Sequence, residues 1–216
     1  MTLDALQKAA SDHALHIVGT CPTKDTDGLG AGTIALLGPD EPAFWATFTA
    51  SPEYADKTAH AMDRWSTRTI TTIADQLAGQ ALFPFGQPAR PFLTWALRTG
   101  VFYSAPVGLL VHRTLGLLAS FRGAVFLDLT VPSGTPAPSP CVTCDAQPCR
   151  TACPIDALTS DGYDVPACHG YLDTKPGNAC LTGGCAVRMA CPLSQSVGRV
   201  PAQSAFHMAA FHPAKT

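Results

Sequence analysis

Eight of the nine cysteines in this 216-residue chain lie between positions 141 and 191. In order they are Cys141, Cys144, Cys149, Cys153, Cys168, Cys180, Cys185 and Cys191. The fourth and the eighth are each followed directly by a proline, so the segment consists of two sets of four that both end in Cys-Pro. Thiols clustered in this way either hold metal or form disulfides, and both outcomes restrict the folds that the segment can adopt.

Four thiolates are the ligand set of one [4Fe–4S] cluster, so eight in two sets predict a two-cluster ferredoxin-like module. In bacterial proteins of this kind the cysteine before proline ligates the other cluster. By that rule the two sets exchange their last members. The first predicted ligand set is Cys141, Cys144, Cys149 and Cys191, and the second is Cys153, Cys168, Cys180 and Cys185.

The residues beside the two Cys-Pro pairs suit such loops. A residue before proline is disfavoured in the helical region, so we expect Cys153 and Cys191 to end extended segments. Proline is tolerated at the first position of a helix, so a helix is predicted to begin at Pro154. We also expect Gly183 and Gly184 to let backbone amides approach the neighbouring sulfur, because such contacts tune the reduction potential of a cluster.

Two other uses of the cysteines are weighed against this one. Two structural zinc sites would also take four cysteines each, yet they favour paired Cys-x2-Cys units, and only Cys141 and Cys144 have that spacing. A disulfide framework is typical of short secreted chains. The gaps before Cys149, Cys185 and Cys191 are wider than in the standard run, which leaves open a [3Fe–4S] form or the loss of one cluster.

The composition indicates a globular protein. The chain is 46% hydrophobic and 14% charged, with a net charge of −2 and no basic run, so we expect no nucleic-acid partner. The apolar stretch at 107–119 is interrupted by His112 and Arg113 and is too short to span a membrane. The first residues lack the features of a secretory signal, so we expect a cytoplasmic protein, in which thiols stay reduced.

Upstream of the cysteines, apolar residues alternate between helical and strand patterns. Helices are predicted at 3–13, 52–79 and 91–98, and strands at 16–19, 33–38 and 123–129. The longest helix has an apolar face made of Ala59, Met62, Trp65, Thr69, Ile73 and Leu77, which we interpret as core. This mixture predicts an α+β protein with an N-terminal α/β layer domain.

The expected domains follow the composition. Residues 1–131 would form the α/β domain and residues 132–140 a proline-rich linker. Residues 141–199 would form the dicluster module, and residues 200–216 a tail that lies over one of the domains.

Several isolated residues receive an ordinary structural interpretation. The glycine-rich stretch 27–32 opens a strand and not a helix, so we expect a turn and not a phosphate-binding loop. Cys21 is expected to be a buried free thiol. His169 is expected beside the cluster or at the surface, and His207 and His212 are interpreted as tail residues.

The cysteine module resembles that of the epoxyqueuosine reductase family. The likeness rests on residues 164–172, 177–180, 184–185 and 190–192, within the segment from Cys141 to Pro192. The upstream elements follow the order of that family, and residues 82–88 are similar to its stretch with the proposed catalytic aspartate. The resemblance implies a cobalamin in the N-terminal domain, supplied with electrons by the adjacent clusters.

The chain also departs from this family. The position of the aspartate holds Phe85, which cannot donate a proton. Residues 108–116 lack the glycine-glycine-lysine-asparagine loop expected near the corrinoid, and the C-terminal tRNA-binding repeats are missing. The resemblance therefore implies a shortened relative that keeps the electron-transfer module.

Three functions are compatible with these features. The first is electron transfer to or from a redox partner protein, which needs only the two clusters. The second is an oxidoreductase with cobalamin or flavin in the N-terminal domain, in which His112, Tyr103 or water would supply a proton. The third is a protein whose clusters are structural or sense oxidants. No catalytic residue is assigned, and the eight cysteines are the predicted site.

Overall fold

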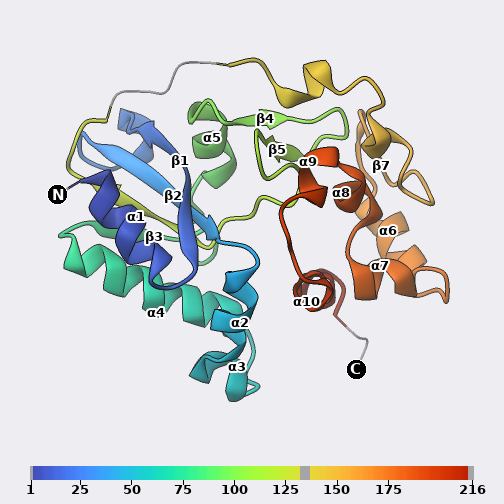
Figure 1. Cartoon of the computed structure of the whole chain (residues 1–216), viewed down its shortest axis with the longest axis horizontal. Helices are drawn as coiled ribbons and strands as arrows, with labels where there is room; N and C mark the ends of the chain where they lie inside the picture. Colours follow the sequence, from blue (N-terminus) through green and yellow to red (C-terminus); the bar gives the residue numbers. More distant parts are fainter. Residues whose placement is uncertain (1, 132–136, 214–216) are drawn as a thin grey trace. The chain divides into compact units, whose positions relative to one another are not determined.

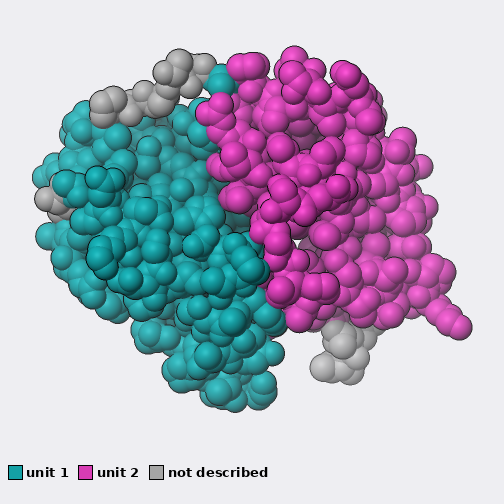
Figure 2. Space-filling view, in the orientation of Figure 1, with its two compact units in different colours: residues 1–102, 120–137 teal, residues 103–119, 138–216 magenta. Residues whose placement is uncertain are grey.

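The computed structural model describes residues 2–131 and 137–213 of the chain (Figure 1). Residues 132–136, in the predicted linker, lie outside the described residues. The chain is α+β, with antiparallel sheets and a helical C-terminal region. It divides into two units, coloured separately in Figure 2. Unit 1 comprises Met1–Phe102 with Ser120–Ala137, and unit 2 comprises Tyr103–Ala119 with Pro138–Thr216.

A four-stranded antiparallel sheet forms the centre of unit 1, with the strand order β1-β2-β6-β3. Its strands are β1 (Leu15–Pro22), β2 (Thr33–Pro39), β3 (Gln80–Leu82) and β6 (Gly123–Leu127). The predicted strands are therefore confirmed, while β3 was not predicted because three residues are too few to show a period. Every residue of β2 is buried, so both faces of the sheet are covered, which explains its continuous apolar run.

Among the described residues, unit 1 contains five α-helices. They are α1 (Leu3–Ser11), α2 (Ala43–Thr49), α3 (Pro52–Ala55), α4 (Ala61–Gln76) and α5 (Phe92–Arg98). Helices α1 and α4 contact each other and the sheet, and α5 packs against β1 (Figure 1). The predicted helices at 3–13 and 91–98 are confirmed as α1 and α5.

The long helix predicted at 52–79 is divided into α3 and α4, so that prediction is wrong in its continuity. Lys57 and His60 both have a φ of 56°, a left-handed conformation that ends one helix before the next begins. Within α4 the predicted apolar face is confirmed. Its members Met62, Trp65, Thr69 and Ile73 are buried, whereas Ala59 precedes the helix and is exposed, and Leu77 is half-buried at its end.

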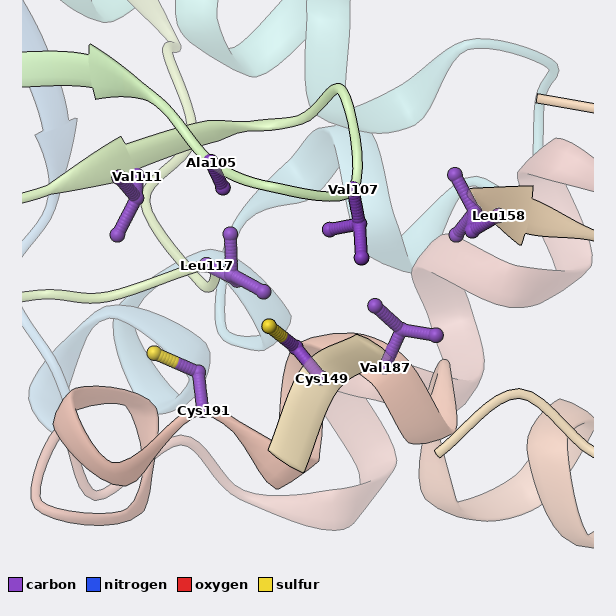
Figure 3. Close-up of a cluster of buried hydrophobic side chains, with 8 residues drawn as sticks. All are labelled: Ala105, Val107, Val111, Leu117, Cys149, Leu158, Val187 and Cys191. Carbon is purple, nitrogen blue, oxygen red and sulfur yellow. The ribbon is translucent and has the colours of Figure 1, made fainter. Parts of the chain in front are cut away.

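Unit 2 is built on a core that brings together two distant parts of the chain. The strands β4 (Phe102–Ser104) and β5 (Leu110–His112) form a two-stranded sheet, and the residues around them pack against the cysteine segment. Figure 3 shows this core, in which Val107, Val111 and Leu117 lie with Cys149 and Cys191. Residues 103–119 thus lie in unit 2, although they were assigned to the predicted N-terminal domain.

Hydrogen bonds reinforce the same association. The Leu117 amide donates to Ser194 Oγ at 3.0 Å, and Arg188 Nη1 donates to the Leu117 carbonyl at 2.7 Å. Arg199 Nη2 donates to the Leu118 carbonyl at 2.8 Å. Residues 103–119 therefore help to form the scaffold that carries the cysteines.

The C-terminal region of unit 2 is helical. Its elements are η2 (Pro140–Thr143), η3 (Pro148–Arg150), β7 (Leu158–Thr159), β8 (Gly162–Tyr163), α6 (Val165–Leu172), α7 (Asn178–Gly183), α8 (Ala186–Ala190), α9 (Pro192–Gln195) and α10 (Pro201–Phe211). The predicted tail contains α10, which packs against α7. Among the described residues, no helix combines the length and the apolar character needed to cross a membrane.

Candidate metal centre

Two short 3-10 turns, η2 and η3, present the first three cysteines of unit 2. Ser139 precedes η2 and its hydroxyl oxygen accepts a hydrogen bond from the Cys141 amide at 3.3 Å. Cys144 follows the end of η2, and Cys149 lies in the middle of η3. Pro140 and Pro148 open the two turns, where a missing N–H carries no penalty. The sequence therefore folds this loop around three thiols.

Cys191 supplies a fourth thiol from the junction between α8 and α9. Its φ of −64° and ψ of 124° are extended, as predicted for a residue before proline, and Pro192 opens α9. The thiol is close to Gly116: a Cβ atom at Gly116 would lie 3.0 Å from Cys191 Sγ and 2.6 Å from the Ser194 nitrogen. Gly116 also has a φ of 58°, so only glycine fits there easily.

A cavity of about 290 Å³ lies among these four cysteines. Its walls are Ala105, Pro106, Val111, Leu117, Pro140, Cys141, Thr143, Cys144, Gln147, Pro148, Cys149, Cys191, Pro192 and Leu193. Since one water molecule occupies about 30 Å³ in the liquid, the cavity is large enough for a group of several atoms. Four thiols on a largely apolar wall are the donor set that a [4Fe–4S] cluster takes.

Burial and nearby cysteines raise the pKa of two thiols at this site. Burial raises the pKa of Cys149 most, and the neighbouring thiols Cys141, Cys191 and Cys144 raise it further. Burial also raises the pKa of Cys141, again with contributions from Cys191 and Cys144. These interactions all fall within the first predicted ligand set. Binding of metal to such thiols must release their protons.

The other four cysteines come from separate elements of unit 2. Cys168 lies on α6, Cys180 on α7, Cys185 at the start of α8, and Cys153 in the loop after η3. Burial raises the pKa of Cys180, and the thiols of Cys185, Cys168 and Cys153 raise it as well. These interactions fall within the second predicted ligand set. Among the described residues, no group of three or more His, Cys, Asp or Glu is placed so that it could hold a metal ion.

Two hydrogen-bond donors reach sulfur atoms of this second set. The Ala157 amide donates to Cys153 Sγ at 3.2 Å, and the Tyr163 hydroxyl donates to Cys168 Sγ at 3.3 Å. Burial, and then the bond to Cys168, raise the pKa of Tyr163, which keeps its hydroxyl protonated as a donor.

One local prediction around these cysteines is wrong. No helix begins at Pro154, because the chain turns back there: Asp156 has a φ of 51° and the Ala157 amide points to the Cys153 sulfur. The prediction that Gly183 and Gly184 let amides approach sulfur stays a prediction, and the structure shows a separate role for Gly184. A Cβ atom on it would lie 2.9 Å from Cβ of Ser204, so this glycine allows α10 to approach.

The histidines near the second set form a cluster that the sequence did not reveal. The rings of His169 and His212 are 4.7 Å apart, and His212 Nε2 lies 2.8 Å from Asp173 Oδ1. Phe211 contacts the His169 ring edge-on at 4.7 Å. His212, interpreted as a tail residue, thus pairs with Asp173, 39 positions away.

His112, considered as a proton donor, and Phe85, at the position of the family's aspartate, both have structural surroundings. His112 is 7% exposed, and its Nδ1 accepts hydrogen bonds from the amides of Thr114 and Leu115 at 3.3 Å and 3.1 Å. These bonds require a lone pair on Nδ1, so the histidine orders the turn after β5. Phe85 is half-buried and stacks on Phe83, with ring centroids 5.3 Å apart.

Unit 1 contains a buried ion pair that sequence analysis missed. Asp27 is 6% exposed and accepts hydrogen bonds from Arg98 Nη2 at 2.7 Å and Trp95 Nε1 at 2.8 Å. Arg98 Nη2 also lies 3.6 Å from the sulfur of Cys21, which is 1% exposed, as predicted for a buried thiol. The glycine-rich stretch 27–32 is therefore a turn anchored to α5.

No protein-family model matches this sequence, and no curated protein matches it.

Proposed function

We propose that this protein carries two [4Fe–4S] clusters in unit 2 and transfers electrons to or from a redox partner protein, in the cytoplasm. The observation that carries the proposal is the cavity of about 290 Å³ surrounded by Cys141, Cys144, Cys149 and Cys191. These are three thiols of one loop and one from the distant Cys-Pro pair, the exchange typical of two-cluster ferredoxins. The spacing of the cysteines, with a single Cys-x2-Cys unit, favours iron–sulfur over structural zinc.

The surroundings of the thiols also suit electron transfer. A bound cluster can gain or lose one electron with little rearrangement, and the protein adjusts its potential through burial and hydrogen bonds to sulfur. The residues of unit 2 provide both: an apolar wall at the first ligand set and amide and hydroxyl donors at the second. We accordingly interpret unit 2 as a two-cluster ferredoxin-like module.

Unit 1 is interpreted as a degenerate form of the N-terminal domain of epoxyqueuosine reductases, on the sequence resemblance. Phe85 lies against Phe83 at the position of the aspartate of that family, so unit 1 lacks the corresponding acid. We therefore favour electron transfer over the alternative function, an oxidoreductase that uses cobalamin or flavin. Titration of the whole protein with each cofactor, followed by absorbance, tests this order, since saturable binding of either one would reverse it.

The central experiment is the metal content of anaerobically purified protein. We expect about eight iron and eight sulfide per chain, with the brown absorbance of iron–sulfur clusters. Cys144→Ser and Cys185→Ser should each lose about half of the iron, because each removes one ligand of a different cluster. Cys21→Ser is the matched control and should keep all of it, since Cys21 lies in unit 1 beside Arg98. A colourless, folded protein that holds zinc would contradict the proposal.

A further inference from the structure

The two ligand sets differ in what surrounds their sulfur atoms. In the first set Cys149 and Cys191 are each 8% exposed and lie among apolar residues such as Val111 and Leu117 (Figure 3), while Cys141 and Cys144 are half-buried. In the second set all four cysteines are half-buried, and donors reach two of the sulfurs.

This difference affects how easily a cluster bound by each set accepts an electron. A cluster that accepts an electron becomes more negative, and that form is stabilised by water and by donors whose positive ends point at sulfur. An apolar, buried surrounding has the opposite effect. The second ligand set therefore favours the reduced state more than the first.

Of the two donors that reach the second set, the Tyr163 hydroxyl is the one that comes from a side chain, and several contacts fix its position. Tyr163 is the last residue of β8, paired with Leu158 of β7, and Asp164 then caps α6 by accepting from the Ala167 amide at 2.9 Å. Its ring stacks on Phe211 at the end of α10, with a centroid distance of 6.0 Å and an interplanar angle of 14°. Helix α10 thus holds the hydroxyl at 3.3 Å from Cys168 Sγ.

We propose that the Tyr163 hydroxyl, held against Cys168 by Phe211, raises the reduction potential of the cluster in the second set and makes it the more easily reduced of the two. The inference rests on the proposed function, since it requires both clusters. It gives the C-terminal helix α10 a function, because its Phe211 positions Tyr163 and Tyr163 adjusts the reduction potential of the cluster. An electron taken up by the protein would then reside on the second cluster.

The test is a redox titration of the anaerobic full-length protein, followed by absorbance and electron paramagnetic resonance. Tyr163→Phe removes the hydroxyl and keeps the ring that stacks on Phe211. We expect the higher of the two midpoint potentials to fall by roughly 40 mV, a fivefold change in the equilibrium constant, since tenfold corresponds to 59 mV for one electron. Tyr171→Phe, the same change on the helix that carries Cys168, should leave both potentials unaltered.

Assignment of the potentials to the two sets uses the ligand variants. Cys144→Ser, which spares the second set, should retain the higher potential, and Cys185→Ser the lower one. The inference is overturned if Tyr163→Phe leaves the higher potential unchanged, if it shifts the lower one, or if the retained potentials are reversed.

Two further outcomes distinguish failure of the inference from a variant that does not fold and from failure of the proposed function. If Tyr163→Phe does not fold, Phe211→Leu removes the stacking partner, and the higher potential should again fall, while an unchanged value contradicts the inference. If the wild-type protein itself holds no iron, the proposed function fails and the inference with it. Two clusters whose potentials ignore Tyr163 would overturn the inference alone.

Discussion

At the scale of single residues, Asp27 is a charged side chain that is buried and hydrogen-bonded to several neighbours. Its side chain is 3% exposed and that of Arg98 is 14% exposed, with 2.7 Å between Oδ2 and Nη2. Burial alone would raise the pKa of Asp27, but hydrogen bonds from Arg98, the Lys24 amide and Trp95 outweigh burial and lower it. The carboxylate therefore stabilises unit 1 in its charged form.

We expect Asp27→Asn to lower the free energy of unfolding by about 3 kcal/mol at neutral pH, because it leaves the Arg98 charge without its partner. The folded-state pKa is below the unfolded one, so the contribution of Asp27 is full above about pH 4 and is lost as the pH falls through the folded value. The difference between wild type and variant should therefore shrink in acid. Denaturant unfolding between pH 3 and 7 measures it (a pH range set by the carboxyl pKa values of about 4).

Asp25→Asn provides the control for this prediction. Asp25 is exposed and begins the same 3-10 turn, η1 (Asp25–Asp27), so the same chemical change there should alter stability by less than about 0.5 kcal/mol. Equal losses in the two variants would show that the buried pair has no special role.

At the scale of elements, the stretch that contains β4 and β5 packs against cysteines of the first predicted ligand set. Gly116 combines a φ of 58° with close approach to Ser194 and Cys191, so it lets this stretch contact the start of α9. Gly108 in the same stretch has a φ of 72°, but a Cβ atom there would only reach the Thr159 carbonyl at 3.9 Å. The two glycines therefore share their backbone conformation and differ in available space.

Gly116→Ala should destabilise the protein by about 2 to 4 kcal/mol, from the left-handed backbone and the clash together. It should also reduce the iron content, because the added methyl group displaces Cys191. Gly108→Ala carries the backbone cost alone, about 1 kcal/mol, and should retain its iron. Thermal unfolding and iron analysis of both variants test this pair, and full iron in Gly116→Ala would argue against a role for this contact.

At the scale of the whole molecule, we expect the two units to depend on the proposed clusters to different degrees. Unit 1 has a four-stranded sheet with its own apolar core. The core of unit 2 includes Cys149 and Cys191 themselves, and α7, α8 and α9 have six, five and four residues, which is too short for stability in isolation. Metal binding and the folding of unit 2 should therefore be coupled.

Removal of the clusters by an oxidant and a chelator should expose the amides of unit 2 and leave those of unit 1 protected. Hydrogen exchange of the full-length protein, analysed by mass spectrometry, measures both units in one sample. We expect β2 and β6 to exchange as slowly as before, and α7 and α8 to exchange rapidly. Persistent protection in α7 and α8 would indicate that the protein scaffold alone maintains this unit.

The sequence by itself determined the number and spacing of the cysteines, the extended backbone at Cys191 and the core strands at 33–38 and 123–129. Each of these depends on a residue type or on neighbours a few positions away, where proline geometry and apolar periodicity act. The break between α3 and α4 escaped this reasoning, because left-handed residues at Lys57 and His60 have no local signature.

Only the tertiary structure decided which distant segments meet. It brought residues 103–119 to the cysteine loop, paired Asp27 with Arg98 across 71 positions, and aligned Phe211 with Tyr163 and Cys168. Such contacts arise from the packing of whole elements. A single sequence carries no pairwise signal for them, since each partner alone is an ordinary polar, aromatic or apolar residue.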